Sequence, residues 1–174
     1  PWDFAITKNA KRPSAFTQTI LVPFAVETAL SGVEAKVKKS DFLHYRKTFE
    51  VPDAYVGHDA ILHLDAVDQI CDVFLNGHFL AHHESGYFPI AVHTAYLSKS
   101  NVLEVTVSDD TESEIFPRGK QSNNPSGIWY TPTSGIWQSV WLESVPDDGY
   151  IKSVKMNPLF DEQKLKIQAE FVGN

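Results

Sequence analysis

Four carboxylates gather within six positions of this 174-residue chain, at Asp109, Asp110, Glu112 and Glu114. A pair of carboxylates can hydrolyse a glycosidic bond when one acts as acid and the other as base or nucleophile. That division needs an environment that raises one pKa, and this cluster follows a strand pattern without an apolar pocket around it. The sequence therefore favours a solvated acidic loop. The alternative is that one aspartate accepts hydrogen bonds from sugar hydroxyls.

Four aromatic residues crowd into thirteen positions further along the chain, at Trp129, Tyr130, Trp137 and Trp141. Aromatic faces stack on the C–H faces of pyranose rings, so such a cluster suits sugar recognition. Trp141 lies between two aliphatic residues in a strand pattern, which favours packing. Trp129 and Tyr130 lie in a loop flanked by glycine and proline, where sugar binding and contact with another domain both remain open.

The histidines His78, His82 and His83, with Glu84, could suggest a metal site. A zinc protease needs the order His-Glu-x-x-His on a helix, and this segment lacks it. The segment follows a hairpin turn, so neighbouring side chains point to opposite faces of a strand and cannot easily share a metal. Glycine-rich phosphate loops and the Gly-x-Ser-x-Gly elbow are also absent from the sequence. We expect neither a metal nor a cofactor in this chain.

The elements that must position these residues are strands, because apolar and polar residues alternate with period two. The pattern is clear in four segments: 45–51, 60–66, 102–108 and 164–171. Asn76-Gly77 supplies the two positive-φ residues of a type I′ turn, which predicts a hairpin over residues 71–80. Residues 24–38 are the best helix candidate, yet Pro23 and Gly32 favour loops and one helical turn. Short strands at regular spacing predict an all-β sandwich or jelly roll.

Residues 109–139 break this pattern with three prolines and little alternation. A loop this long inside a compact domain is usually functional or packed against a partner. A boundary falls near Pro146, and residues 150–155 and 164–171 form another hairpin-like pair. Two strands alone make no stable domain, so this pair is either part of a second domain or lent to a neighbour. Both chain ends look excised from a longer protein.

The charge, the cysteine count and the apolar runs of the sequence argue against several classes of protein. The formal net charge of −7 argues against nucleic acid or an anionic membrane as partner. The single cysteine, Cys71, excludes an intrachain disulfide framework. The sequence has no apolar run near the ~20 residues that a membrane helix requires.

Several segments resemble the N-terminal sugar-binding domain of glycoside hydrolase family 2. The resemblance covers about residues 42–146, and its most specific pieces are Pro117-Arg118-Gly119-Lys120-Gln121 and the segment 134–143, which reads Ser-Gly-Ile-Trp-Gln-Ser-Val-Trp-Leu-Glu. The strand 43–52, the hairpin 72–78, the segment 83–89 and the asparagine-led strand 101–107 also match.

The resemblance implies a jelly-roll domain at residues 1–146 and the start of a truncated immunoglobulin-like sandwich at residues 147–174. In that family the two catalytic glutamates belong to a (β/α)₈ barrel, so no catalytic residue is expected here. The implied parent is a retaining, β-galactosidase-like glycosidase, whose barrel shares a carbohydrate substrate with this domain and packs against it. Two rivals stay open: a free-standing carbohydrate-binding module and a purely structural docking domain.

The same resemblance implies which residues contact substrate. An aspartate at the end of the asparagine-led strand can touch the sugar, which maps to Asp109 or Asp110. The loop from Arg118 to Gln121, together with Trp129 and Tyr130, would lie on the side that faces the barrel. Arg118 could pair with a carboxylate there or tie the domains together.

Overall fold

Alternation of buried and exposed side chains builds the main sheet of the computed structural model, which describes residues 1–146 and 148–173. In β9 (Ser100–Ser108), Leu103, Val105 and Val107 are buried, as the sequence predicts. β9 lies at the centre of a six-stranded sheet with the order β2-β1-β3-β9-β6-β7, in which neighbouring strands are antiparallel. The other bounds are β1 Trp2–Thr7, β2 Gln18–Ile20, β3 Phe42–Glu50, β6 Ile70–Leu75 and β7 His78–Glu84.

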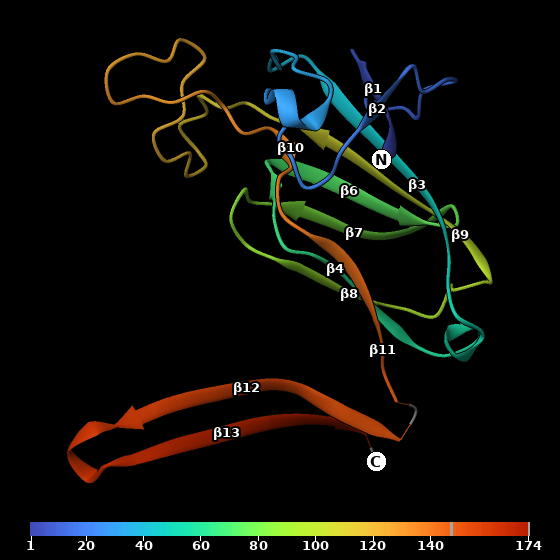
Figure 1. Cartoon of the computed structure of the whole chain (residues 1–174), viewed down its shortest axis with the longest axis vertical. Coiled ribbons are helices and arrows are strands. Elements are labelled where there is room, and N and C mark those ends of the chain that lie inside the picture. The colour runs from blue at the N-terminus through green and yellow to red at the C-terminus, as the bar shows by residue number, and fades with distance from the viewer. Residues whose placement is uncertain (147, 174) are drawn as a thin grey trace.

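A smaller layer closes the sandwich. It consists of the three-stranded sheet β11-β4-β8 and the short pair β10-β5. The bounds are β4 Ala60–Leu64, β5 Val67–Asp68, β8 Ile90–Thr94, β10 Gly135–Ile136 and β11 Val140–Ser144. Leu64 and Val67 from this layer join Leu43 and Val73 from the large sheet in one buried apolar cluster. The predicted all-β sandwich is confirmed, and its two layers are visible in Figure 1.

Local predictions are also confirmed. Asn76 and Gly77 have φ values of 52° and 80°, as a type I′ turn between β6 and β7 requires. Residues 24–38 contain a single 3₁₀ turn, η1 (Ala29–Ser31), whose Thr28 side chain accepts a hydrogen bond from Leu30 N–H. A second 3₁₀ turn, η2, spans Asp53–Tyr55. No helix among the described residues is long and apolar enough to cross a membrane.

The last two strands form a long hairpin of their own. β12 (Gly149–Leu159) pairs with β13 (Lys164–Gly173) across the 3₁₀ turn η3 (Phe160–Glu162). The hairpin lies apart from the sandwich, beyond the end of β11 (Figure 1). Its apolar side chains are exposed, with Ile167 at 60% and Phe171 at 71% of full exposure. Its base is touched by the sandwich where the rings of His93 and Tyr150 lie 5.6 Å apart.

Candidate functional site

The long loop after β9 is held at one edge of the sandwich by three carboxylates: Glu27, Asp68 and Asp109. Asp109 follows β9 directly and is 3% exposed, while Asp68 ends β5 and is 4% exposed. Ser134, fully buried just before β10, joins two of them. Its N–H donates to Glu27 Oε2 at 3.0 Å and its hydroxyl donates to Asp109 Oδ2 at 2.5 Å. The end of the loop is therefore anchored on buried acidic groups.

Burial sets the charge state of these carboxylates. Desolvation, and after it the nearby Asp109, raise the pKa of Asp68 to about 7 against the hydrogen bond from Gln121, which lowers it. Desolvation also raises the pKa of Asp109 and of Glu27, against hydrogen bonds that favour their charged forms. Asp109 Oδ1 and Glu27 Oε1 are buried without a hydrogen-bond partner. An unpaired buried oxygen disfavours the ionised form, which is the direction in which burial shifts both carboxylates.

Two glycines allow the backbone to pack closely against side chains at this edge of the sandwich. A Cβ on Gly135, which has a φ of +85°, would lie 1.9 Å from the Tyr45 hydroxyl oxygen. That hydroxyl accepts a hydrogen bond from Ile136 N–H at 3.3 Å. A Cβ on Gly86 would lie 2.4 Å from Asp68 Oδ1. Only glycine fits at these approaches, so both residues have a packing role.

A pocket of about 260 Å³ opens beside these carboxylates. Gln121 organises it: its Nε2 donates to Asp68 Oδ2 at 3.1 Å, and its Oε1 accepts from Thr133 N–H at 2.5 Å. The pocket is lined by Asp68, Tyr87, Arg118, Gly119, Lys120, Gln121, Tyr130, Thr131, Thr133 and Trp137. Hydroxyl, amide, cationic and aromatic groups converge here, which is the mixture that binds a polyhydroxylated ligand.

The structure brings some of the predicted site residues together and separates others. Arg118 and Tyr130 line the pocket. Trp129 lies beside it, with the Arg118 guanidinium 5.2 Å from its ring centre. Asp109 is buried beneath the loop, and Asp110 forms an ion pair with Lys39 at 2.6 Å.

The sequence analysis did not select Asp68, Gln121, Tyr87 or Glu27 as site residues. Gln121 and Tyr87 lie inside segments that carry the family resemblance, so a residue-by-residue reading of those segments could have found them. Asp68 and Glu27 carry no local signal, because each is a single acidic residue among apolar and turn residues. Their role arises from the fold, which packs both against the strand end at Asp109.

Trp137, Trp141 and His82, which were also considered from the sequence, form hydrogen bonds within the domain. Trp137 Nε1–H donates to Gly86 O at 2.9 Å, and Trp141 Nε1–H donates to Asp65 at 3.0 Å. His82 lies between Asp72 and Glu84, at 2.7 and 3.2 Å, and these hydrogen bonds raise its pKa. Within residues 1–146 and 148–173, the structure holds no group of three or more histidine, cysteine or acidic side chains arranged to bind a metal ion.

The chain resembles known proteins over most of its length. The family described as glycosyl hydrolase 2 galactose-binding domain-like matches residues 19–138. A β-galactosidase of Thermoanaerobacter pseudethanolicus is 31% identical over 114 residues, which cover 63% of this chain and 14% of that protein. A β-galactosidase of Thermoanaerobacterium thermosulfurigenes is 29% identical over 126 residues, which cover 69% of this chain and 17% of that protein.

Solved structures agree at the level of the fold. A β-glucuronidase from an uncultured Clostridium species superposes with a TM-score of 0.70 at 17% identity, over 98% of this chain and 32% of that one. The chain thus spans a small part of each relative that it matches.

Proposed function

The chain belongs to the galactose-binding-like domain family of glycosyl hydrolase 2, and we propose that it is the non-catalytic sugar-binding domain near the N-terminus of a longer β-galactosidase-like enzyme. The β-galactosidases named above support the choice of sugar. In this proposal, glycosidic bonds are cleaved by catalytic carboxylates outside the chain, in a barrel domain. The chain contributes substrate contacts and packs against that barrel.

The pocket beside Asp68 is the observation that carries this proposal. It collects Arg118, Tyr130 and Gln121 from one loop, and buried carboxylates hold that loop in place. We assign Arg118 and Tyr130 to contacts with sugar hydroxyls and the sugar ring, with Trp129 positioning the guanidinium by a cation–π contact. Asp109 supports the loop from beneath. Asp110, paired with Lys39, is assigned as a further acceptor for sugar hydroxyls.

The hairpin β12–β13 supports the division into residues 1–146 and 147–174. Two strands with exposed apolar side chains need further strands or another layer to be covered. A second, immunoglobulin-like sandwich that continues past this chain would supply them. This part of the proposal predicts that a longer piece of the parent protein buries Ile167 and Phe171.

Activity assays test the proposal. The isolated chain should not hydrolyse p-nitrophenyl β-D-galactopyranoside. In the full-length parent, Arg118→Ala and Tyr130→Ala should each lower kcat/KM by about tenfold, mainly through KM, because they remove substrate contacts rather than catalytic groups. Lys99→Ala, which changes an exposed cation paired with Asp53, is the matched control and should leave kcat/KM unchanged. Turnover by the isolated chain would overturn the proposal.

A free-standing binding module is the second candidate, because aromatic side chains are exposed on the loop. Tyr130 is 67% and Trp129 is 40% exposed, next to Ile128 at 64%. Titration of the isolated chain with galactose, followed by tryptophan fluorescence, separates the cases. Saturable binding lost in Tyr130→Ala would favour the module. Absence of any binding that depends on Tyr130, together with the kinetic effects in the parent, would favour a domain that depends on the barrel.

A further inference from the structure

The outer face of the large sheet carries a second cavity, separate from the pocket beside Asp68. It has a volume of about 230 Å³ and lies between strands β3, β9 and β6 and the segment that joins β1 to β2. Its lining residues include Arg12, Phe16, His44, Phe74, Glu104 and Thr106. It shares no lining residue with the pocket beside Asp68. Asp68 ends β5, whereas Phe74 lies near the far end of β6.

The strand register explains why these side chains meet. Glu104 on β9 is paired with Phe74 on β6, and Thr106 is paired with His44 on β3. Each of these residues alternates with buried neighbours that face the core, so all four face the other side of the sheet. Directly opposed residues on one face of a sheet have Cβ atoms about 5 Å apart. Two adjacent cross-strand pairs therefore form the floor of the cavity.

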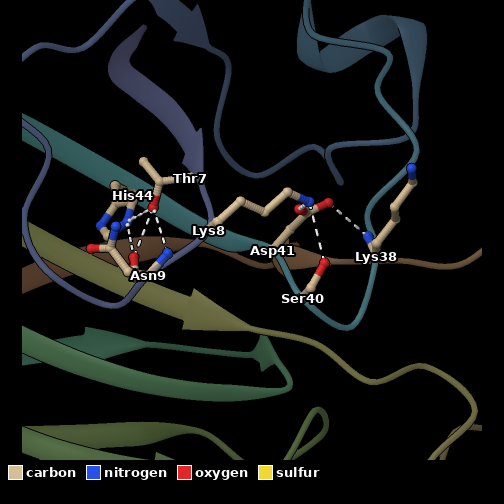
Figure 2. A network of polar contacts seen from close by, with 7 residues as sticks. All are labelled: Thr7, Lys8, Asn9, Lys38, Ser40, Asp41 and His44. Atoms are coloured by element: carbon tan, nitrogen blue, oxygen red, sulfur yellow. Dashed lines mark hydrogen bonds and ion pairs between the residues drawn. The ribbon is translucent and has the colours of Figure 1, made fainter.

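The wall of the cavity is fixed before any ligand arrives. The segment after β1 is tied to the sheet by Thr7 and Asn9 at His44 and by Lys8 at Asp41, as Figure 2 shows. His44 Nε2 lies 2.9 Å from Thr7 Oγ1 and 3.3 Å from Asn9 O, while its Nδ1 lies 3.3 Å from Thr106 Oγ1. A neutral ring with its proton on Nε2 satisfies these contacts, and burial lowers the pKa of His44.

Aromatic rings supply the apolar part of the cavity. The Arg46 guanidinium lies 4.2 Å from the centre of the Phe16 ring and holds that ring in the wall. Phe74 packs edge-on against Phe79, with ring centres 5.5 Å apart. Rings held in this way offer C–H contact surface at little cost in conformational entropy.

The polar groups offer hydrogen bonds without net charge. Arg12 Nε lies 2.7 Å from Glu104 Oε1, and Arg46 binds Asp3 through two nitrogens, so the charges around the cavity are compensated in pairs. Glu104 Oε1 is nevertheless buried without a hydrogen bond of good geometry. Arg12 neutralises the charge on this oxygen but leaves its hydrogen-bonding capacity unused, and a hydroxyl group of a ligand would donate to it.

We propose that this cavity is an ancillary site for one neutral hexopyranose unit, independent of the pocket beside Asp68. Glu104 accepts from a sugar hydroxyl, Arg12 donates to a neighbouring one, and Phe16 and Phe74 contact the C–H surface of the ring. A volume slightly below the ~300 Å³ of the smallest drug-sized pockets suits one ring rather than a longer oligosaccharide. Charge compensation disfavours an anion as the ligand.

Chemical-shift mapping of the ¹⁵N-labelled 174-residue chain tests this site. Titration with methyl β-D-galactopyranoside or methyl β-D-glucopyranoside should shift the amides of His44, Phe74, Gly77 and Thr106 saturably with at least one of the two. A dissociation constant of about 1–10 mM is expected, since a single ring forms few contacts. Inorganic phosphate, the anionic probe, should leave these amides unshifted.

Two variants and one control test whether the sugar binds to the residues that line the cavity. Glu104→Gln and Phe16→Ala should each weaken binding at least tenfold. Phe16 lies in the connecting segment, so its variant keeps the test valid should Glu104→Gln disturb the sheet. Glu50→Gln, the same change on an exposed carboxylate of β3, should bind like the wild type. The proposal fails if neither sugar binds, if the shifts gather around Tyr130 instead, if phosphate alone binds, or if both variants bind unchanged.

Discussion

The loop of residues 109–134 and the hairpin β12–β13 both leave the sandwich, yet they are related to it in opposite ways. The loop has little secondary structure but ends on buried polar groups, where Ser134 reaches Glu27 and Asp109. The hairpin has long, regular strands, but its apolar side chains remain exposed. Regular backbone hydrogen bonding therefore does not measure how firmly a segment is fixed. Burial of its side chains does.

Stability should depend most strongly on Gly135, the glycine that anchors the loop. Gly135→Ala should lower the free energy of unfolding by about 4 kcal/mol, because it adds an overpacked Cβ to a residue with positive φ. The new Cβ would overlap the Tyr45 hydroxyl, so the double variant Gly135→Ala/Tyr45→Phe should recover part of the loss. Urea unfolding measures both.

Gly127→Ala is the matched control within the same loop. Gly127 also has positive φ, at +59°, but a Cβ there meets nothing within 4 Å. It should therefore cost only about 1 kcal/mol, from backbone strain alone. Equal losses for the two glycines would show that the close approach at Tyr45 does not limit the fold.

A pair of identical substitutions compares sandwich and hairpin directly. Leu64→Ala, at a fully buried position, should cost about 3 kcal/mol through lost burial and a cavity. Leu165→Ala, at a position on β13 that is 54% exposed, should stay within about 0.5 kcal/mol. In a longer piece of the parent that covers the hairpin, the second value should rise. If it did not, the proposal that the hairpin belongs to a second sandwich would lose its support.

The sequence predicted strands equally well in the sandwich and in the hairpin. Alternation in residues 102–108 and 164–171 indicates strands in each case, and both are confirmed. Alternation reports which side chains share a face, but not what covers that face. Whether Phe171 is buried depends on a layer that alternation in its own strand cannot specify.

The candidate site was predicted less completely for a related reason. Arg118 and Tyr130, which the sequence singled out, line the pocket, but Asp68 and Glu27 come from distant segments. A carboxylate that becomes important only through burial against others has no local pattern. Asp109 and Asp110 show the limit clearly: adjacent in sequence, one lies in the interior and the other pairs with Lys39 at the surface.

The buried Asp68 should make the free energy of unfolding depend on pH. Its folded-state pKa of about 7 lies above its ordinary value of 3.8, so the folded state binds a proton that the unfolded state releases. Stability should therefore fall as pH rises from about 4 to 7. Asp68→Asn removes this titration and can still accept from Gln121. Relative to the wild type, the variant should gain stability between pH 4 and pH 8, by up to about 1.4 kcal/mol for each pH unit.

Unfolding of both proteins at several pH values measures this gain. Asp53→Asn, which neutralises an exposed carboxylate at η2, controls for the loss of one negative charge and should give a curve parallel to the wild type. Parallel curves for Asp68→Asn as well would mean that Asp68 is not desolvated in solution.

Two serines donate hydrogen bonds to carboxylates, one in the loop and one in the hairpin, and their removal should change stability least. Ser134→Ala removes the hydroxyl bound to the buried Asp109 and should cost about 1 kcal/mol. The loss should grow with rising pH, because that hydrogen bond favours the charged form of Asp109 and lowers its pKa. Ser153→Ala removes a similar bond, of 3.1 Å to the exposed Glu170 on the hairpin, and should change nothing measurable since water replaces it. Denaturation of both variants at pH 5 and pH 8 makes the comparison, and a Ser134→Ala loss independent of pH would separate loop anchoring from the charge of Asp109.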